Sequence, residues 1–563
     1  MPDTNLPDTN LPDTNLHDTT LPGHHAALDT AHIGDIQGAL GTIRQNDTNP
    51  RTTWKGRFAT LMAIVGPGLI VMVGDNDAGA FGTYTQAGQN YGTALLWTLI
   101  MLVPVLYVNQ EMVVRLGTVT GVGHARLILE RFGRFWGAFS VIDLFILNGL
   151  TIVTEFIGIN LALGYLGVPK VWGIAVAAGV IIAAASTGSF RRFERFSVGL
   201  CFFSLLLVPV FLIVHPPLAE VGRDLVVPRF PDGKLSDIML LIIAIVGTTV
   251  APWQLFFQQS YIVDKRVTPH FLAYLKVDLV IGIVAVMVGG IAMMGFTAMA
   301  FHGTDDFGKF TDAGAVALGL EAHGGRAAGV MFALALLDAS IIGASAVSLA
   351  TAYAIGDVLA LRHSLHRKAT DAWGFYAVYA GLIAVAAALV LLGSDALLGL
   401  LTNAVQTLAG VLLPSATVFL LLLCNDKAVL GPWANGKWLN LFTGAVIWVL
   451  VMLSIILTTA TVFPDMSGET ILVILGGGSA VGALGYAIFA FVNGRRGDAA
   501  AEGHADPARL RAIRAGWRMP PLGELAPPVL SLSKRIWMGV LRAYLIAAVV
   551  LVAFKVFQVA TGH

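Results

Sequence analysis

The chain has 563 residues, of which 56% are hydrophobic and only 12% charged, and its formal net charge is zero. Soluble globular domains carry about 25% charged residues, so this composition excludes a soluble protein and indicates many helices that cross a lipid bilayer. Because there is no net positive charge, the composition gives no support to nucleic acid as a partner.

The first fifty residues are polar and repetitive. PDTNL occurs three times and is followed by HDTTL, all within residues 2–21. No apolar stretch of a signal peptide is present, and without a hydrophobic face residues 1–50 are predicted to form a disordered tail. The histidines of this tail could bind a metal weakly or belong to a solvated extension; they are His17, His24, His25 and His32.

Apolar segments of spanning length follow one another after the tail. They lie at 58–88, 94–114, 136–166, 171–187, 196–215, 237–262, 273–301, 327–360, 372–393, 397–424, 438–460 and 470–493. We expect residues 56–424 to form a ten-helix transport core, 438–493 to be accessory transmembrane helices and 494–533 to be a cytoplasmic linker. A last segment, 536–559, is interrupted by Arg542 and Lys555 and could span the membrane or lie at its interface.

Lysine and arginine are unevenly distributed among the loops. If the N-terminus is cytoplasmic, the inside loops carry most of them, for example Arg191–Arg192 and Lys265–Arg266, and the bias alternates without a skipped helix. The positive-inside rule therefore predicts a multi-pass protein of the inner or plasma membrane with a cytoplasmic N-terminus.

The first apolar segment is interrupted near its middle. It begins at Gly66-Pro67-Gly68 and then contains Asp75, Asn76 and Asp77 followed by Ala-Gly. Carboxylates inside a membrane span cost a few kcal/mol each on insertion scales, so they are expected where a cation, a water-filled cavity or a partner meets them. Such an interruption is typical of an unwound stretch whose carbonyls line a cavity.

The sixth segment contains a second interruption, in VGTTVAPWQLFFQQ. Pro252 lacks an N–H and cannot bond to the carbonyl four residues earlier, which frees the oxygen of Thr248. Interruptions five segments apart indicate an inverted-repeat transporter with a site at the membrane midplane. The sequence therefore predicts an all-α polytopic membrane protein with a 5+5 inverted repeat and discontinuous helices 1 and 6.

Several polar groups are candidates for binding a cation between these breaks. Asp77 is the leading ligand, and it could also act as the N-cap of the second half-helix. Asp75 could add a second negative charge facing the cavity or could instead face water. The Thr248 carbonyl is favoured over the threonine hydroxyls, which usually bond back to the preceding turn. Gln406, in the tenth segment, could be an amide ligand or could join two helices.

The other polar residues within the apolar segments do not predict a dedicated proton pathway. The remaining acids are Asp143, Glu155, Asp278 and Asp338. Glu155 shares a helical stripe with Asn148, Thr151 and Thr154, which is typical of either a pathway or an interhelical network. No obvious intramembrane arginine or histidine is present, which argues against a dedicated proton relay.

Taken in order, the motifs resemble those of the NRAMP family of divalent-metal transporters over about residues 56–460. GPGLIVMVGDNDAGA resembles the family's first-helix segment, RLGTVTG the loop after its second helix, TEFIG its third-helix motif, GTTVAPW its sixth-helix motif, and CNDKAVLGPWANGKWLN the loop after its tenth helix. This resemblance implies a LeuT-type fold with alternating access. It also implies that Asp77 binds the metal, with the Gly74 and Thr248 carbonyls and Gln406.

The chain departs from the family pattern at the expected site. Ala78 and Ala80 stand where the family has Pro and a liganding Asn, and Ala251 stands where it has a Met whose thioether favours softer metals. Trp253 replaces a His, and Ile152 replaces an acidic residue. The ninth segment lacks the family's arginine.

Loss of an amide and a thioether, together with the additional Asp75, implies a roomier, harder and more acidic site. This pattern is closest to the NRAMP-related magnesium transporters, and it predicts import of largely hydrated Mg²⁺, and also Mn²⁺, without proton coupling. The metal is then a transported substrate, and no cofactor is expected. The alternatives are a proton-coupled Mn²⁺/Fe²⁺ transporter and an organic-substrate carrier of the same fold. No motif of an enzyme is present.

Overall fold

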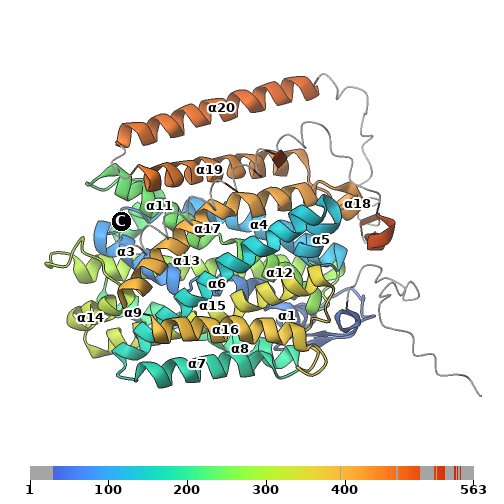
Figure 1. The fold of residues 1–563 in the computed structure, drawn as a ribbon, viewed down its shortest axis with the longest axis horizontal. Helices are drawn as coiled ribbons and strands as arrows, with labels where there is room; N and C mark the ends of the chain where they lie inside the picture. The colour runs from blue at the N-terminus through green and yellow to red at the C-terminus, as the bar shows by residue number, and fades with distance from the viewer. Residues whose placement is uncertain are drawn as a thin grey trace, which may run out of the picture.

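The computed structural model describes residues 29–393, 395–463 and 467–494, and beyond them residues 513–514, 517–525, 538–539, 542 and 546. Within these ranges, nine helices are long and apolar enough to cross a membrane, or up to eleven if each of two bent helix pairs is one span. Figure 1 shows the long helices side by side, with α19 and α20 along one edge of the bundle and α7 and α8 along the opposite edge.

The helices follow the predicted segments closely. Their bounds are α1 (Trp54–Ile64), α2 (Pro67–Val73), α3 (Ala78–Tyr91), α4 (Trp97–Thr120), α5 (His124–Phe132), α6 (Arg134–Tyr165), α7 (Lys170–Ala185), α8 (Phe190–Phe203), α9 (Leu207–Val214), α10 (Leu218–Val226), α11 (Leu235–Thr249), α12 (Pro252–Asp264), α13 (Leu272–Phe301), α14 (Ala313–Gly324), α15 (Arg326–Leu359), α16 (Trp373–Leu392), α17 (Asp395–Cys424), α18 (Lys427–Leu430), α19 (Lys437–Val462) and α20 (Gly468–Gly494). The predicted linker 494–533 and the predicted helix 536–559 lie mostly outside the described residues.

Both predicted interruptions are present. The first apolar segment is three helices: α1 and α2 are bent by 52°, and α2 ends at Val73 before α3 begins at Ala78. The sixth segment ends its first half at Thr249 and restarts at Pro252. Proline at the first position of α12 needs no N–H partner, so the break falls where the sequence predicts it.

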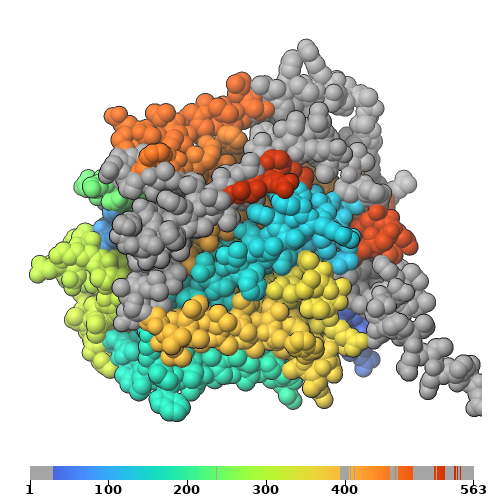
Figure 2. Space-filling view, viewed as in Figure 1, coloured from blue at the N-terminus to red at the C-terminus, as the bar shows by residue number. Residues whose placement is uncertain are grey.

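The outer face of the bundle is apolar, as a membrane requires. On the face seen in Figure 2, α6, α16 and α7 follow one another as bands. Large apolar side chains are exposed on each of them, among them Phe145 and Ile146 of α6, Val176 of α7 and Val385 of α16. In water such a surface would be an association site, whereas in a bilayer it faces lipid tails.

Asp278 of α13 fixes the start of α2. Its carboxylate accepts hydrogen bonds from the backbone N–H groups of Gly66 (3.1 Å), Gly68 (2.6 Å) and Leu69 (3.2 Å). These are the N-terminal donors of α2, which have no partner within the helix and attract a negative charge. A Cβ atom on Gly68 would lie 2.8 Å from the backbone of Leu279, so glycine permits this close packing.

A buried ion pair holds the bend between α1 and α2. Lys265, at the end of α12, lies 2.7 Å from Glu194 of α8, and both side chains are fully buried. The Lys265 ammonium also donates to the carbonyls of Ile64 and Val65, where α1 ends. The pair therefore joins α8 and α12 to the first helix.

Substituting Glu194 with glutamine should destabilise the protein strongly, because it leaves the Lys265 ammonium buried without a counter-charge. Breaking a buried pair in this way costs about 3–5 kcal/mol. Thermal unfolding in detergent should show a clear fall in Tm. As a matched control, Glu130→Gln removes a partner of the more exposed pair with Arg126 and should cost less than about 1 kcal/mol. Equal Tm values for the two variants would contradict this account.

Residues 29–43 are ordered, so the prediction of a disordered tail over residues 1–50 is wrong for this part. They form a 3-10 turn (Thr30–His32) and a two-stranded hairpin of β1 (Ile36–Gln37) and β2 (Thr42–Ile43). Asp29 pairs with Arg367 at 2.7 Å, and the backbone N–H of Ala39 donates to Glu194. Residues 1–28, with the other histidines of the predicted tail, lie outside the described residues.

His363, in the loop after α15, supports this segment in its charged form. Its Nε2 lies 3.0 Å from Asp357, and its carbonyl contacts the His32 ring. Burial alone would lower the pKa of His363, but the hydrogen bond and the charge of Asp357 raise it to about 9. For Asp29 burial acts in the opposite direction and would raise the pKa. Hydrogen bonds from Arg367 and Ala31 nevertheless hold the pKa of Asp29 below its usual value.

The stability that His363 contributes should therefore depend on pH. A raised pKa gives a contribution that is complete below about 6.5, the unfolded value, and is lost as the pH rises toward 9. The difference in Tm between the wild type and His363→Gln should be largest near pH 6 and should shrink by pH 9. A difference that stays constant, or that matches the one for the exposed His215→Gln, would contradict the assignment.

Candidate functional site

Asp77 lies at the break in the first segment and caps α3. Its backbone is extended, and its side chain accepts a hydrogen bond from the N–H of Ala80 at 2.9 Å. Only 5% of the residue is exposed. The predicted capping role is therefore present, and it uses one oxygen of a carboxylate that has two.

Glu155 of α6 meets Asp77 at this point. Its Oε2 accepts from the N–H of Ala78, the residue after Asp77, at 3.1 Å. Its Oε1 is buried and has no hydrogen-bond partner among the described residues. A Cβ atom on Gly343 of α15 would lie 2.9 Å from the Glu155 carboxyl carbon and 3.1 Å from Asp77. Two buried carboxyl groups this near to one glycine are stabilised by a cation beside them or by protonation of one of them.

Asp75 is also buried, with 1% of its surface exposed. Its Oδ1 accepts a hydrogen bond from the side-chain amide of Gln254 on α12. Its Oδ2 has no hydrogen-bond partner in the described part of the chain. The neighbouring Asn76 instead donates to the Val286 carbonyl of α13 at 3.2 Å, so it attaches the break to the scaffold.

The two breaks lie together in space. Gln254 spans from the second break to Asp75, and the hydroxyl of Tyr84 on α3 lies 2.7 Å from that of Thr249 at the end of α11. A side-chain carbon on Gly74 would lie 3.6 Å from the Trp253 ring. The structure therefore brings the first break, with Gly74, beside the second.

The threonines of the second break differ from each other. The Thr249 hydroxyl bonds back to the carbonyl of Ile245, as threonines in membrane helices usually do. The Thr248 hydroxyl is buried and has no partner among the described residues. Pro252 has no N–H to offer to the Thr248 carbonyl. Gln406 is on α17, but its side chain lies outside the described residues, so its predicted contact with the ion stays a prediction.

The donors at the breaks are carboxylates, amides, hydroxyls and carbonyls. In the described part of the chain, no group of three or more His, Cys, Asp or Glu residues is placed to hold a metal ion. A cation between the breaks would therefore take part of its coordination from carbonyls and water.

Comparison with known proteins agrees with this architecture. The family model described as Nramp, natural resistance-associated macrophage protein-like, matches residues 68–460. This chain belongs to the Nramp family.

Relatives with similar sequences share this membership. The divalent metal cation transporter MntH of Ralstonia nicotianae is 32% identical over 416 residues, which cover 69% of this chain and 88% of that protein. MntH of Xylella fastidiosa is 27% identical over 443 residues, which cover 76% and 89%. Among solved structures, the manganese transporter of Eremococcus coleocola in complex with an aromatic bis-isothiourea substituted compound has a TM-score of 0.60 at 20% identity. The match covers 82% of this chain and 98% of that one. The predicted fold is confirmed.

The sequence of this Nramp-family protein placed Glu155 in a polar helical stripe but did not predict that it lies at the site. The signal that could have placed it was the TEFIG motif at 154–158. Of the rest of its stripe, Asn148 joins α6 to α15 by donating to Thr351 at 2.8 Å, whereas Thr151 bonds back to Leu147 within α6. Asp338 accepts from Ser204 at 2.9 Å and likewise joins helices.

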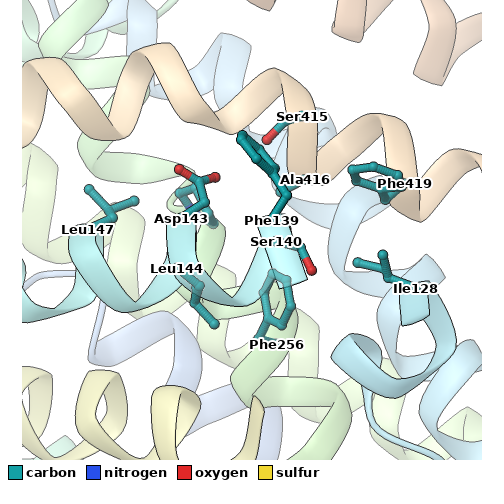
Figure 3. A pocket seen from close by; sticks show the side chains of 11 residues that line it. Ile128, Phe139, Ser140, Asp143, Leu144, Leu147, Phe256, Ser415, Ala416 and Phe419 are labelled. Atoms are coloured by element: carbon teal, nitrogen blue, oxygen red, sulfur yellow. The ribbon is translucent and has the colours of Figure 1, made fainter. Parts of the chain in front are cut away.

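Asp143 lies in a separate cavity between α5, α6, α12 and α17. Figure 3 shows its carboxylate with the hydroxyls of Ser140 and Ser415 near a group of phenylalanine rings. The cavity holds about 10 Å³, which is room for about one water molecule. A hydrated cation does not fit in this cavity, although Pro252 at the second break forms part of its lining.

Proposed function

We propose that this Nramp-family protein imports divalent metal ions, with largely hydrated Mg²⁺ as the main substrate and Mn²⁺ as a second one. Transport proceeds by alternating access and without proton coupling, from the outside of the plasma membrane to a cytoplasm that contains the N-terminus. Family membership and the names of the relatives, divalent metal cation transporters, support the class of substrate.

The observation that carries the proposal is the pair of buried aspartates in one break. Asp75 and Asp77 add two negative charges, Asp75 has an oxygen without a partner, and Ala251 replaces the thioether at the second break. A charge of −2 attracts a divalent ion, and oxygen donors without sulfur favour a hard one. The same charges would repel the carboxylate of an organic substrate, which disfavours an amino-acid carrier.

No coupled proton is needed to drive import. A negative-inside potential of about 100 mV contributes about 2.3 kcal/mol per charge, hence about 4.6 kcal/mol for a divalent ion. One observation favours the second candidate, a proton-coupled Mn²⁺/Fe²⁺ transporter: Glu155 bonds to the backbone beside Asp77, and its Oε1 has no hydrogen-bond partner among the described residues, so it is a candidate to carry a proton.

Flux into proteoliposomes separates these two functions. Under a potassium-diffusion potential, Mg²⁺ should compete with Mn²⁺ entry, and a pH dye inside the vesicles should report no change beyond that in protein-free vesicles. Acidification that follows metal entry would overturn the uncoupled mechanism. Mn²⁺ entry that is indifferent to excess Mg²⁺ would overturn Mg²⁺ as the substrate.

A further inference from the structure

We propose that Gln254 and Gln110 are positioning residues for Asp75. They form a chain of side-chain amides that holds one oxygen of this carboxylate and leaves the other for the transported ion. In this way Gln254 sets the affinity for a divalent cation through the orientation of Asp75. The inference rests on the proposed function, because it assigns how a residue of that site is held.

The two glutamine amides connect three separate elements of the fold. Gln254 lies in the first turn of α12, and its Nε2 donates to Asp75 Oδ1 in the first break. The same nitrogen lies 3.4 Å from the carbonyl of Thr249. Its Oε1 accepts from Nε2 of Gln110 on α4 at 3.0 Å. Both glutamines are fully buried, so no exposed water competes for these bonds.

The two hydrogen bonds run in one direction, from Gln110 to Gln254 and from Gln254 to Asp75. An ionised carboxylate only accepts hydrogen bonds, so the NH₂ group of Gln254 must face Asp75. Its carbonyl oxygen then faces Gln110, which must present its own NH₂ group. Both amides are thereby oriented by the carboxylate, and the bond from Gln254 to an ionised Asp75 is stronger than the bond between the two neutral amides.

The consequence is a carboxylate with one held oxygen and one unpaired oxygen. Asp75 lies on an unwound stretch, where no regular helix restricts its side chain. With Oδ1 bound by Gln254, the buried Oδ2 is left without a partner in the described part of the chain. A buried charged oxygen is costly unless something pairs with it, and a cation in the break would do so. A ligand that is already oriented loses less freedom when the ion binds.

A double-mutant cycle in proteoliposomes tests this role, with Mn²⁺ as the tracer ion and Mg²⁺ as the competitor. Gln254→Met keeps the length of the side chain but cannot donate. It should raise KM about tenfold, as loss of one hydrogen bond to a charged group does, with the maximal rate within about twofold of wild type. Asp75→Asn should also raise KM. The double variant should be no worse than Asp75→Asn alone, because Gln254 acts only through Asp75.

Gln258→Met is the matched control. Gln258 is one turn further along α12 and equally buried, and its amide has no hydrogen-bond partner among the described residues. Its KM should stay within about twofold of wild type. If Gln254→Met does not yield folded protein, Gln110→Met breaks the same chain one bond further out and should raise KM in the same way.

Three outcomes would overturn the positioning role: an unchanged KM in the Gln254 or Gln110 variants, effects of Gln254→Met and Asp75→Asn that multiply, or an equal effect of Gln258→Met. Failure of the proposed function looks different. In that case Mg²⁺ does not compete even in the wild type, while the cycle can still be read from Mn²⁺ entry.

Discussion

Replacing Asp77 with alanine should abolish metal uptake. Its carboxylate is buried at the break, near Glu155 and two residues from Asp75. Removing a charged partner from a buried contact costs about 2–5 kcal/mol, which is a loss of about 30-fold or more in affinity. Binding isotherms with Mg²⁺, Mn²⁺ and Cd²⁺ should show the loss directly, and vesicle flux should fall to the background of protein-free vesicles.

The alanine substitution also removes the N-cap of α3, so a second variant must separate the two roles. Asparagine is as good an N-cap as aspartate but carries no charge. Asp77→Asn should therefore keep the Tm of the wild type and still fail to transport, whereas Asp77→Ala should lose about 1 kcal/mol of stability as well. Transport by Asp77→Asn at the wild-type rate would show that Asp77 serves the helix and not the ion.

Replacing Ala251 with methionine should shift selectivity toward softer ions. Ala251 is the N-cap of α12, is buried and has an extended backbone that any side chain can adopt. A thioether at this position would offer a soft donor to Mn²⁺ and Cd²⁺ but little to Mg²⁺. The concentration of Mg²⁺ needed to halve Mn²⁺ entry should rise about tenfold, a change of about 1.4 kcal/mol. Cd²⁺ uptake should increase.

Ala251→Leu separates softness from size. Leucine has a similar volume to methionine but no sulfur. If the thioether acts as a ligand, only the methionine variant favours Cd²⁺, whereas a purely steric effect would weaken entry of every ion in both variants. Unchanged Mg²⁺ competition in Ala251→Met would remove Ala251 from the residues that determine selectivity.

The sequence could predict the helices and their interruptions because the signals are local. A proline at 252 and the Asp-Asn-Asp run after Gly74 act on their own turns of helix, and both breaks occur where those residues stand. The prediction for residues 29–43 was wrong for a related reason. A 3-10 turn and strands of two residues have no periodicity, and Asp29 is held by Arg367, which is 338 residues away.

Asp75 and Asp77 could also be picked out as candidate ligands, since both lie within one interruption, and their binding of an ion stays a prediction. The residues that contact this break could not be predicted from the sequence. Gln254 reaches Asp75 across 179 residues and Glu155 reaches Ala78 across 77, and no local pattern records such contacts.

The sequence by itself thus determined a bundle of apolar helices with two breaks and an acidic first break, because hydrophobic length, proline and glycine act within a few residues. Only the tertiary structure decided that Glu155 bonds to the backbone beside Asp77, that Gln254 holds Asp75 and that Asp143 lines a cavity too small for a hydrated cation. Those pairings follow from how helices pack against one another, and packing depends on the whole set of side-chain shapes at once.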